Sequence, residues 1–163
     1  MQEILSMSDF TPHSVSPYLV CANARQAIAF YQQAFGAEQL LVINTADGGI
    51  LHATLKINGS SMMLTEQNPE SQGISHMSLS DSPVTIHLVV DDVDAVMHKA
   101  QQAGATVIME PAERFWGDRF ACLKDPFGHT WSLATPLRNM SEAEIQQAAN
   151  SMMASKAEDE NNL

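Results

Sequence analysis

Hydrophobic and polar positions in the first part of the chain follow the order strand, helix, strand, hairpin. Residues 17–21 form a short apolar run that favours a buried strand. Asn23 can cap a helix whose apolar residues recur at helical spacing, and Gly36 is typical of a helix C-terminus. Strand-like segments lie between residues 39 and 57, and Asn58-Gly59 predicts a tight hairpin turn into a returning strand.

The same order of elements begins again after a polar, turn-rich stretch at residues 67–83. Thr85 to Val90 indicates a strand, Asp92 or Asp94 can cap the following helix, and Thr106 to Met109 indicates another strand. The two parts also share sequence: QQAFGAEQL is similar to QQAGATVI, and LKINGSSMML is similar to LKDPFGHTWSL. The chain therefore contains an internal repeat.

This repeat predicts an α+β fold made of two βαβββ modules, at residues 15–66 and 84–137. Neither module can bury both its sheet face and its helix alone, so we expect a curved mixed sheet around a cleft. The most definite local signal is the turn at residues 125–128, Asp-Pro-Phe-Gly. Proline fixes one turn dihedral and glycine permits a positive φ, so this turn can join two antiparallel strands.

The segments outside the two modules have simpler patterns. Residues 1–14 show no periodicity and predict a flexible lead-in. Ser141 and Glu144 form a capping box at the start of a predicted C-terminal helix, residues 138–154, which carries an apolar stripe. That stripe needs a surface to lie on, either its own domain or a second copy of the chain. Residues 155–163 predict an acidic disordered tail.

Composition narrows the classes of partner. The 163 residues are 45% hydrophobic, enough for one sizeable core, and no apolar run is long enough to span a membrane. The formal net charge of −11 disfavours nucleic acid and anionic membranes, because both need clustered lysine or arginine. No secretory signal is visible, and Cys21 and Cys122 each lie within an apolar run. We therefore expect a cytoplasmic protein with buried, reduced cysteines.

Several motifs carry a resemblance to a known family. They are Ala27-Ile28-Ala29-Phe30-Tyr31, Phe35-Gly36-Ala37, His52-Ala53, Asn58-Gly59, Val90-Asp91-Asp92-Val93-Asp94, Trp116-Gly117-Asp118-Arg119, Asp125-Pro126-Phe127-Gly128-His129-Thr130-Trp131 and Ser141-Glu142-Ala143-Glu144-Ile145. Together they resemble the vicinal-oxygen-chelate superfamily, which includes glyoxalase I, bleomycin- and fosfomycin-resistance proteins and extradiol dioxygenases. Within it they are most similar to the PhnB-like group. The resemblance covers about residues 15–152 and identifies the scaffold rather than a reaction, because this scaffold hosts many chemistries.

The resemblance also implies where a metal ion would be bound. Metal-using members of the superfamily place a His or Glu ligand on the first and last strand of each module. Counting from the helix starts and hairpin glycines puts those positions at Ser16, Met63, Thr85 and Ser132. None of them supplies an imidazole or a carboxylate, so we expect neither this metal site nor another cofactor. A shifted site built from His52, Glu66 and His87 is the alternative.

Alternation along the strands predicts which side chains line the cleft. Tyr18 and His87 occupy matching places in the two modules, and His87 is the first candidate for acid–base chemistry, although it can equally serve only as a hydrogen-bonding group. Trp116 is expected to cover the pocket. Arg119 can clamp a carboxylate or phosphate, or else pair with a neighbouring acid, namely Asp118, Asp125 or Glu113. The full set of predicted ligand-binding residues is Tyr18, Met63, Thr85, His87, Trp116, Arg119 and Ser132. Trp131 is expected to lie in the core.

Three functions fit these observations. The first is a metal-free protein, most simply a homodimer, that binds a small organic molecule as the bleomycin-resistance proteins do. The second is a metal-dependent lyase, isomerase or dioxygenase that uses the shifted ligands. The third is a metal-free enzyme that uses His87, with Arg119 as the anchor for its substrate. A methyltransferase activity has little support, because no glycine-rich cofactor loop follows a strand.

Overall fold

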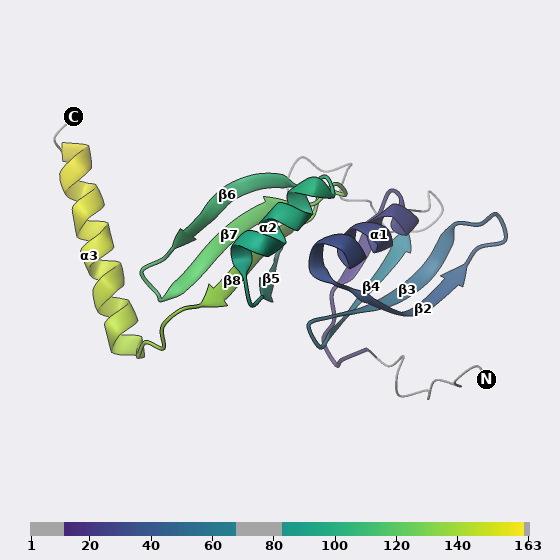
Figure 1. Cartoon of the computed structure of the whole chain (residues 1–163), viewed down its shortest axis with the longest axis horizontal. Helices are drawn as coiled ribbons and strands as arrows, with labels where there is room; N and C mark the ends of the chain where they lie inside the picture. The colour runs from purple at the N-terminus through teal and green to yellow at the C-terminus, as the bar shows by residue number, and fades with distance from the viewer. Residues whose placement is uncertain (1–11, 68–82, 162–163) are drawn as a thin grey trace.

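The computed structural model describes residues 12–67 and 83–161 of the chain. Most of the predicted lead-in and linker falls outside these residues. The described residues form two four-stranded mixed sheets, with strand orders β1-β4-β3-β2 and β5-β8-β7-β6, as Figure 1 shows. In each sheet the first and last strands of the module are parallel neighbours, and the other pairs are antiparallel. The predicted pair of βαβββ modules is confirmed.

The elements of the two modules correspond one to one. The first module contains β1 (Tyr18–Cys21), α1 (Ala24–Phe35), β2 (Glu38–Asn44), β3 (Ile50–Ile57) and β4 (Ser60–Glu66). The second module contains β5 (Thr85–Val89), α2 (Val93–Gln102), β6 (Thr106–Glu113), β7 (Asp118–Lys124) and β8 (Thr130–Pro136). The second strand of the second module, predicted at 106–109, is longer than expected, because β6 continues to Glu113 through two irregularities in its pairing with β7.

The repeat in sequence is also a repeat in strand register. Tyr18 is the cross-strand neighbour of Met63 on β4, and His87 is the neighbour of Ser132 on β8. The helix caps match as well. Asn23 accepts a hydrogen bond from the backbone N–H of the residue three positions on, and Asp92 does the same, in both cases at 3.0 Å. Asp92, rather than Asp94, therefore caps α2.

The two predicted turns form as the sequence indicates. Asn58 has φ 47° and Gly59 has φ 82°, the pair of positive values that a tight hairpin turn of this type requires. In the second module the Asp125 N–H donates to the His129 carbonyl at 2.9 Å, and Gly128 has φ 94°. The hairpins hold β4 beside β3 and β8 beside β7.

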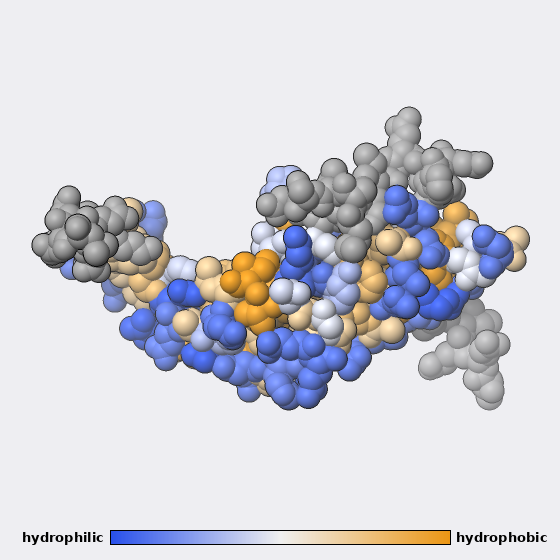
Figure 2. Space-filling view, turned by 90° about the horizontal axis from the view of Figure 1, so that it is seen from above, coloured by the Kyte–Doolittle hydropathy of each residue, from blue (hydrophilic) through white to orange (hydrophobic). Residues whose placement is uncertain are grey.

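Helices α1 and α2 cover one face of the sheets and lie beside each other in Figure 1. The core lies between the helices and this face. Tyr31 on α1 and Trp131 on β8 are almost fully buried in it, which confirms the prediction that Trp131 is a core residue. The described surface seen from above is mostly hydrophilic, with an apolar patch near its middle (Figure 2). Within the described residues, no helix combines the length and apolar character needed to cross a membrane.

The C-terminal helix, α3 (Glu142–Asn161), continues beyond the end that the sequence predicted at residue 154. Part of the predicted disordered tail is therefore helical. The capping box forms, because the Glu144 carboxylate accepts hydrogen bonds from the backbone N–H and the hydroxyl of Ser141, both at 2.7 Å. Figure 1 shows α3 projecting away from the second module.

Replacing Gly117 with alanine is expected to destabilise the fold. Gly117 has φ 100°, and a Cβ added there would lie 2.9 Å from the Arg138 carbonyl oxygen. Both the dihedral and the contact oppose a side chain, so we expect a loss of about 2 kcal/mol in the free energy of unfolding, measured by urea denaturation. Gly48→Ala is the matched control, since Gly48 has φ 90° with no atom within 4 Å of the added Cβ. Equal losses in the two variants would show that the backbone contact contributes nothing.

Candidate functional site

Each sheet has an open face, which is the face opposite the helices. In β1, Leu19 is buried against the helices while its neighbour Tyr18 is 53% exposed. In β5, Leu88 is buried while Thr85 and His87 are exposed. Successive side chains on a strand point to opposite faces. Tyr18 on β1 and Thr85 and His87 on β5 therefore point to the open faces of their sheets. The structure therefore places these three residues where the alternation predicted them.

A cavity of about 640 Å³ lies between β1 and β5. Tyr18 lines it from the first module, and Thr85 and His87 line it from the second. His129, from the turn before β8, lines it as well. A smaller cavity of about 380 Å³ also includes His87 among its lining residues. The two modules thus meet at a hollow in which an aromatic hydroxyl and two imidazoles are within reach of one molecule.

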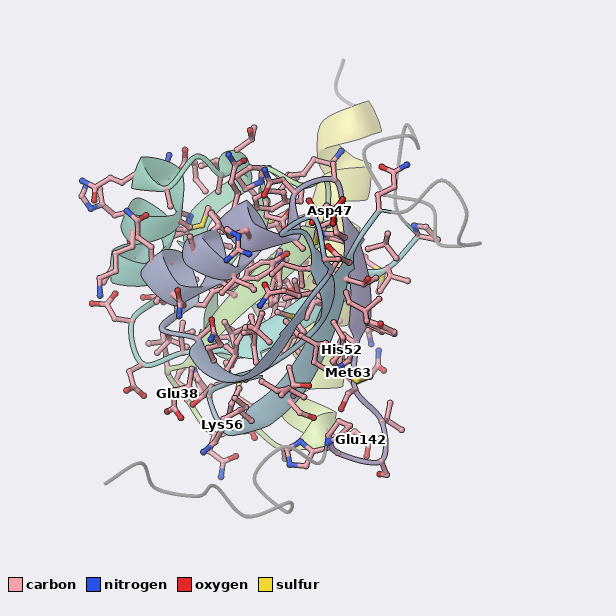
Figure 3. The ribbon with its side chains drawn as sticks, turned by 90° about the vertical axis from the view of Figure 1, so that its right-hand side faces the viewer. Glu38, Asp47, His52, Lys56, Met63 and Glu142 are labelled. Atoms are coloured by element: carbon pink, nitrogen blue, oxygen red, sulfur yellow. The ribbon has the colours of Figure 1, made fainter. Side chains whose placement is uncertain are left out.

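On the first module, Tyr18 forms a polar pair with His52 of β3. The Tyr18 hydroxyl lies 3.3 Å from His52 Nδ1, and the ring centroids are 5.6 Å apart. The other ring nitrogen of His52, Nε2, lies 3.1 Å from the hydroxyl of Thr54. Figure 3 shows His52 and Met63 on the same side of this module. Met63 is half-buried as the cross-strand neighbour of Tyr18, but it lines neither of the two cavities, so its role as a ligand contact stays a prediction.

On the second module, His87 is held by a hydroxyl and an aromatic ring. Its Nδ1 lies 2.8 Å from Ser132 Oγ, and its ring stacks on Phe120 of β7 with the centroids 6.4 Å apart. Among the described residues, His87 Nε2 has no hydrogen-bond partner, so this is the nitrogen that a molecule in the cavity would meet. Ser132 is buried and orients the imidazole. On the open face of the first module, the aromatic ring of Tyr18 lies on β1 and the imidazole of His52 on β3. On the second module these positions are exchanged, with the imidazole of His87 on β5 and the ring of Phe120 on β7.

Beneath the cavity, the carboxylate of Asp125 is the centre of a buried hydrogen-bond network. Its Oδ2 accepts from the Tyr31 hydroxyl at 2.7 Å and from Trp131 Nε1 at 3.0 Å. Its Oδ1 accepts from the backbone N–H groups of Phe127 and His129, both at 2.9 Å. His129 Nδ1 lies 3.4 Å from Oδ2. Because Tyr31 belongs to the first module, this network connects the two modules.

The network keeps Asp125 ionised. Burial by itself raises the pKa of this carboxyl group, but the hydrogen bonds from His129, Tyr31 and Trp131 and the charge of His129 favour the anion. The net effect lowers the pKa below its ordinary value. The net shift is opposite at Cys21, where burial and the negative charges of Asp125 and Glu66 together raise the pKa of the thiol to about 12. Cys21 is therefore a small buried core residue, as expected, and not a nucleophile.

Neither this network nor the place of His129 in the cavity wall was predicted from the sequence. Asp125 was expected only as a turn residue or as a partner of Arg119. A usable signal was present, however. His129 directly precedes Thr130, the first residue of β8. Thr130 pairs with Thr85, the first residue of β5, so His129 lies near the start of β5.

Arg119 does not contribute to the cavity, and this corrects the prediction that it anchors a ligand there. Its Nη2 donates to Asp94 Oδ1 at 2.7 Å, and its Nε forms a second short bond to the same carboxylate. Arg119 shares the parity of the buried residues Ala121 and Leu123 on β7, so it lies on the side of the sheet that α2 covers. The ion-pair partners expected from the sequence were also wrong, because the partner is Asp94.

Trp116 lies over the open face of the second sheet and lines neither of the two cavities described above. Its indole N–H donates to Asp118 Oδ2 at 3.0 Å, and its ring meets Phe120 edge-on with the centroids 5.4 Å apart. Trp116 is thus beside the residues that hold His87, although it does not close the cavity. Its role as a ligand contact stays a prediction.

In the described part of the chain, no three His, Cys, Asp or Glu side chains come together in a way that could hold a metal ion. The alternative shifted site does not assemble. The two ring nitrogens of His52 face Tyr18 and Thr54, and the Glu66 carboxylate accepts the Ile50 N–H at 2.9 Å. At the position implied for a first-strand ligand, the Ser16 hydroxyl is hydrogen-bonded to Ser61 at 2.5 Å.

Comparisons with known proteins agree with this geometry. The chain is 45% identical over 141 residues to the uncharacterized protein Mb0911c of Mycobacterium bovis, covering 85% of this chain and 93% of that one. Among solved structures, a PhnB protein from Bacillus cereus, described as a putative 3-demethylubiquinone-9 3-methyltransferase, has a TM-score of 0.62 at 19% identity, covering 76% of this chain and 99% of that one.

The fosfomycin resistance protein FosX from Listeria monocytogenes, solved with Mn(II) and sulfate, has a TM-score of 0.60 at 15% identity, covering 84% of this chain and 98% of that one. At these identities the two structures show a shared fold. The family model of the Glyoxalase/Bleomycin resistance protein/Dioxygenase superfamily matches residues 12–133. With its two βαβββ modules and the matching family model, the chain belongs to this superfamily.

Proposed function

We propose that this protein binds a small organic molecule in the cavity between β1 and β5 and needs no divalent metal ion to do so. The observation that carries this proposal is the composition of the cavity wall. Side chains from both modules line a volume of about 640 Å³, and none of the described lining residues is a carboxylate. Cavities of this size with a few polar groups on apolar walls are typical of small-molecule sites.

The polar groups of the cavity suit recognition by hydrogen bonding. Tyr18 offers a hydroxyl and His87 offers an imidazole whose ring is fixed by Ser132 and Phe120. The fixed imidazole is the observation that favours a second candidate, a metal-free enzyme in which His87 transfers a proton. Because Arg119 is bonded to Asp94 on the other face, that enzyme would need a different anchor for its substrate.

We also propose that the protein is a homodimer. The support is α3, which projects from the second module in Figure 1 and whose sequence contains an apolar stripe. The described apolar residues of this stripe are Ile145, Ala148, Ala149, Met152 and Met153. Met153 is 55% exposed in the single chain, so a second copy would remove apolar surface from water. Sedimentation equilibrium at micromolar concentration tests this; a monomer at all concentrations would contradict it.

Filling the cavity is expected to abolish binding. The neutral dye 1-aminoanthracene should bind with one-to-one stoichiometry, measured as a saturable rise in its fluorescence. Thr85→Trp places an indole in the cavity wall, and we expect the affinity to fall at least about 100-fold, because the volume is no longer available. Thr106→Trp is the matched control. Thr106 is also exposed and belongs to the same cross-strand row as Thr85, at the opposite edge of the sheet.

The same dye separates the metal-free proposal from its metal-dependent alternative, which the Mn(II)-containing FosX structure favours. EDTA treatment should leave the affinity of the wild-type protein unchanged. A loss of binding after EDTA, restored by Mn²⁺ or Ni²⁺, would overturn the metal-free proposal. Equal binding by Thr85→Trp and wild type would instead show that the dye, and the site, lie elsewhere.

A further inference from the structure

Arg114 lies at the end of the open face of the second sheet, in the turn between β6 and β7. Its N–H donates to the Asp118 carbonyl at 2.8 Å, and its own carbonyl accepts from the Gly117 N–H at 3.0 Å. Arg114 is therefore opposite Asp118 in the hairpin, and Asp118 has the same strand parity as Phe120 and Cys122. This pairing places Arg114 on the open face, whereas Arg119 lies on the face that α2 covers.

The guanidinium of Arg114 lacks the partners that such a group normally has. Its Nε is buried and has no hydrogen-bond partner among the described residues. The carboxylate opposite it, Asp118, accepts the indole N–H of Trp116 instead. A buried N–H of a charged group without an acceptor is destabilising, and native structures seldom leave one without a reason. An acceptor from outside the chain would supply that reason.

The positive charge of Arg114 acts on a row of side chains that leads to His87. Cys122 is the cross-strand neighbour of Ser132, and Ser132 is the neighbour of His87. Adjacent strands are about 4.8 Å apart, so Cys122 and His87 are about 10 Å apart. Burial raises the pKa of Cys122, and the charge of Arg114 opposes this rise. The guanidinium of Arg114 is thus close enough to influence Cys122 at one end of the row. His87 is at the other end.

Aromatic rings flank this row on the same open face. Phe120 lies between Trp116, whose centroid is 5.4 Å away, and His87, whose centroid is 6.4 Å away. Trp116 meets Phe120 edge-on, whereas His87 is nearly parallel to it at 19°. A molecule along this face can therefore contact aromatic rings from Trp116 to His87, with the edge-on Trp116 ring at one end and the two nearly parallel rings at the other.

We propose that the open face of the second sheet binds an organic anion with an aromatic body, whose carboxylate or similar oxyanion is held by Arg114. The aromatic body lies against Phe120 and Trp116, and the far end reaches His87 and the cavity between β1 and β5. Arginine is suited to this role because its planar guanidinium can donate two parallel hydrogen bonds to a carboxylate. This inference rests on the proposed function, since the far end of the same ligand occupies the proposed cavity.

The first experiment tests whether Arg114 attracts anions at this face, using Cys122 as the reporter. Cys21 is buried and its pKa is raised to about 12, so Cys122 is the thiol that reacts. The reaction rate with the anionic disulfide 5,5′-dithiobis(2-nitrobenzoate) is divided by the rate with neutral 4,4′-dithiodipyridine. This ratio should fall about tenfold in Arg114→Gln, because one nearby charge is removed. Arg119→Gln, on the other face, should leave it unchanged.

The second experiment measures ligand class directly. 3-Phenylpropionate and neutral 3-phenylpropanamide are titrated into the full chain, and the NMR signal of the Trp116 indole N–H is followed. The acid should bind about tenfold more tightly than the amide, the effect of one charge-assisted hydrogen bond. Arg114→Gln should abolish this preference, and Arg119→Gln should retain it. The NMR spectra also show whether each variant is folded.

The outcomes separate this inference from the proposal beneath it. Equal affinity for the acid and the amide would overturn the anion subsite while leaving the proposed cavity function in place. An unchanged thiol ratio in Arg114→Gln would overturn it too, as would the absence of any shift with either ligand. Failure of the proposed function is recognised differently, by 1-aminoanthracene binding that does not respond to Thr85→Trp.

Discussion

Replacing Asp125 with alanine is expected to lower the free energy of unfolding by about 4 kcal/mol, because the carboxylate is buried and its removal leaves several buried donors without an acceptor. These donors are the Tyr31 hydroxyl, the Trp131 indole N–H and two backbone N–H groups of the turn. Urea denaturation followed by far-UV circular dichroism measures the change.

Two further variants show whether the loss belongs to the network. Asp47→Ala removes an exposed carboxylate and should change the free energy of unfolding by less than about 0.5 kcal/mol. Tyr31→Phe keeps the buried ring but removes one donor to Asp125, and should cost about 1 kcal/mol. A loss at Asp125 no larger than at Asp47 would mean that the network does not stabilise the fold.

Trp131→Ala is the second substitution with a large expected effect, a loss of about 4 kcal/mol in the free energy of unfolding. The Trp131 side chain is 1% exposed and contacts Phe35, with ring centroids 4.6 Å apart, and Tyr31, with centroids 5.5 Å apart. Both contacts reach α1 of the other module. The substitution therefore leaves a cavity at the place where the modules meet, and also removes a donor to Asp125.

The other tryptophan of the chain provides the matched control. Trp116 is half-buried on the open face, so Trp116→Ala should cost only about 1 kcal/mol. Thermal and urea denaturation of both variants make the comparison. Similar losses at the two positions would contradict the assignment of Trp131 to a close-packed core.

The fold could be predicted because its determinants are local and occur twice. Apolar alternation, helix caps such as Asn23 and the Asn58-Gly59 turn each act within a few residues, and the repeat fixed which segments correspond. Strand alternation also placed Tyr18 and His87 on the open side, since parity on a strand does not depend on distant contacts. The cavity lies between β1 and β5, where the two modules meet.

What the sequence could not supply depends on contacts between distant segments. Tyr31 and Asp125 are 94 residues apart along the chain, so no local pattern pairs them. Arg119 was misplaced for a different reason. Arg119 was chosen because its guanidinium can clamp an anion, whereas the apolar residues Ala121 and Leu123 share its parity on β7 and so place it on the face that α2 covers. The same alternation would have drawn attention to Arg114.

The exchanged positions of imidazole and aromatic ring have a consequence for directionality. A backbone built from two equivalent modules would by itself present the same chemistry to both ends of a molecule lying across them. Here β1 of the first module presents the phenol of Tyr18, and β5 of the second module presents the imidazole of His87. The two ends of the site built on this repeated scaffold are therefore chemically different. A ligand with two different ends has one preferred orientation in it.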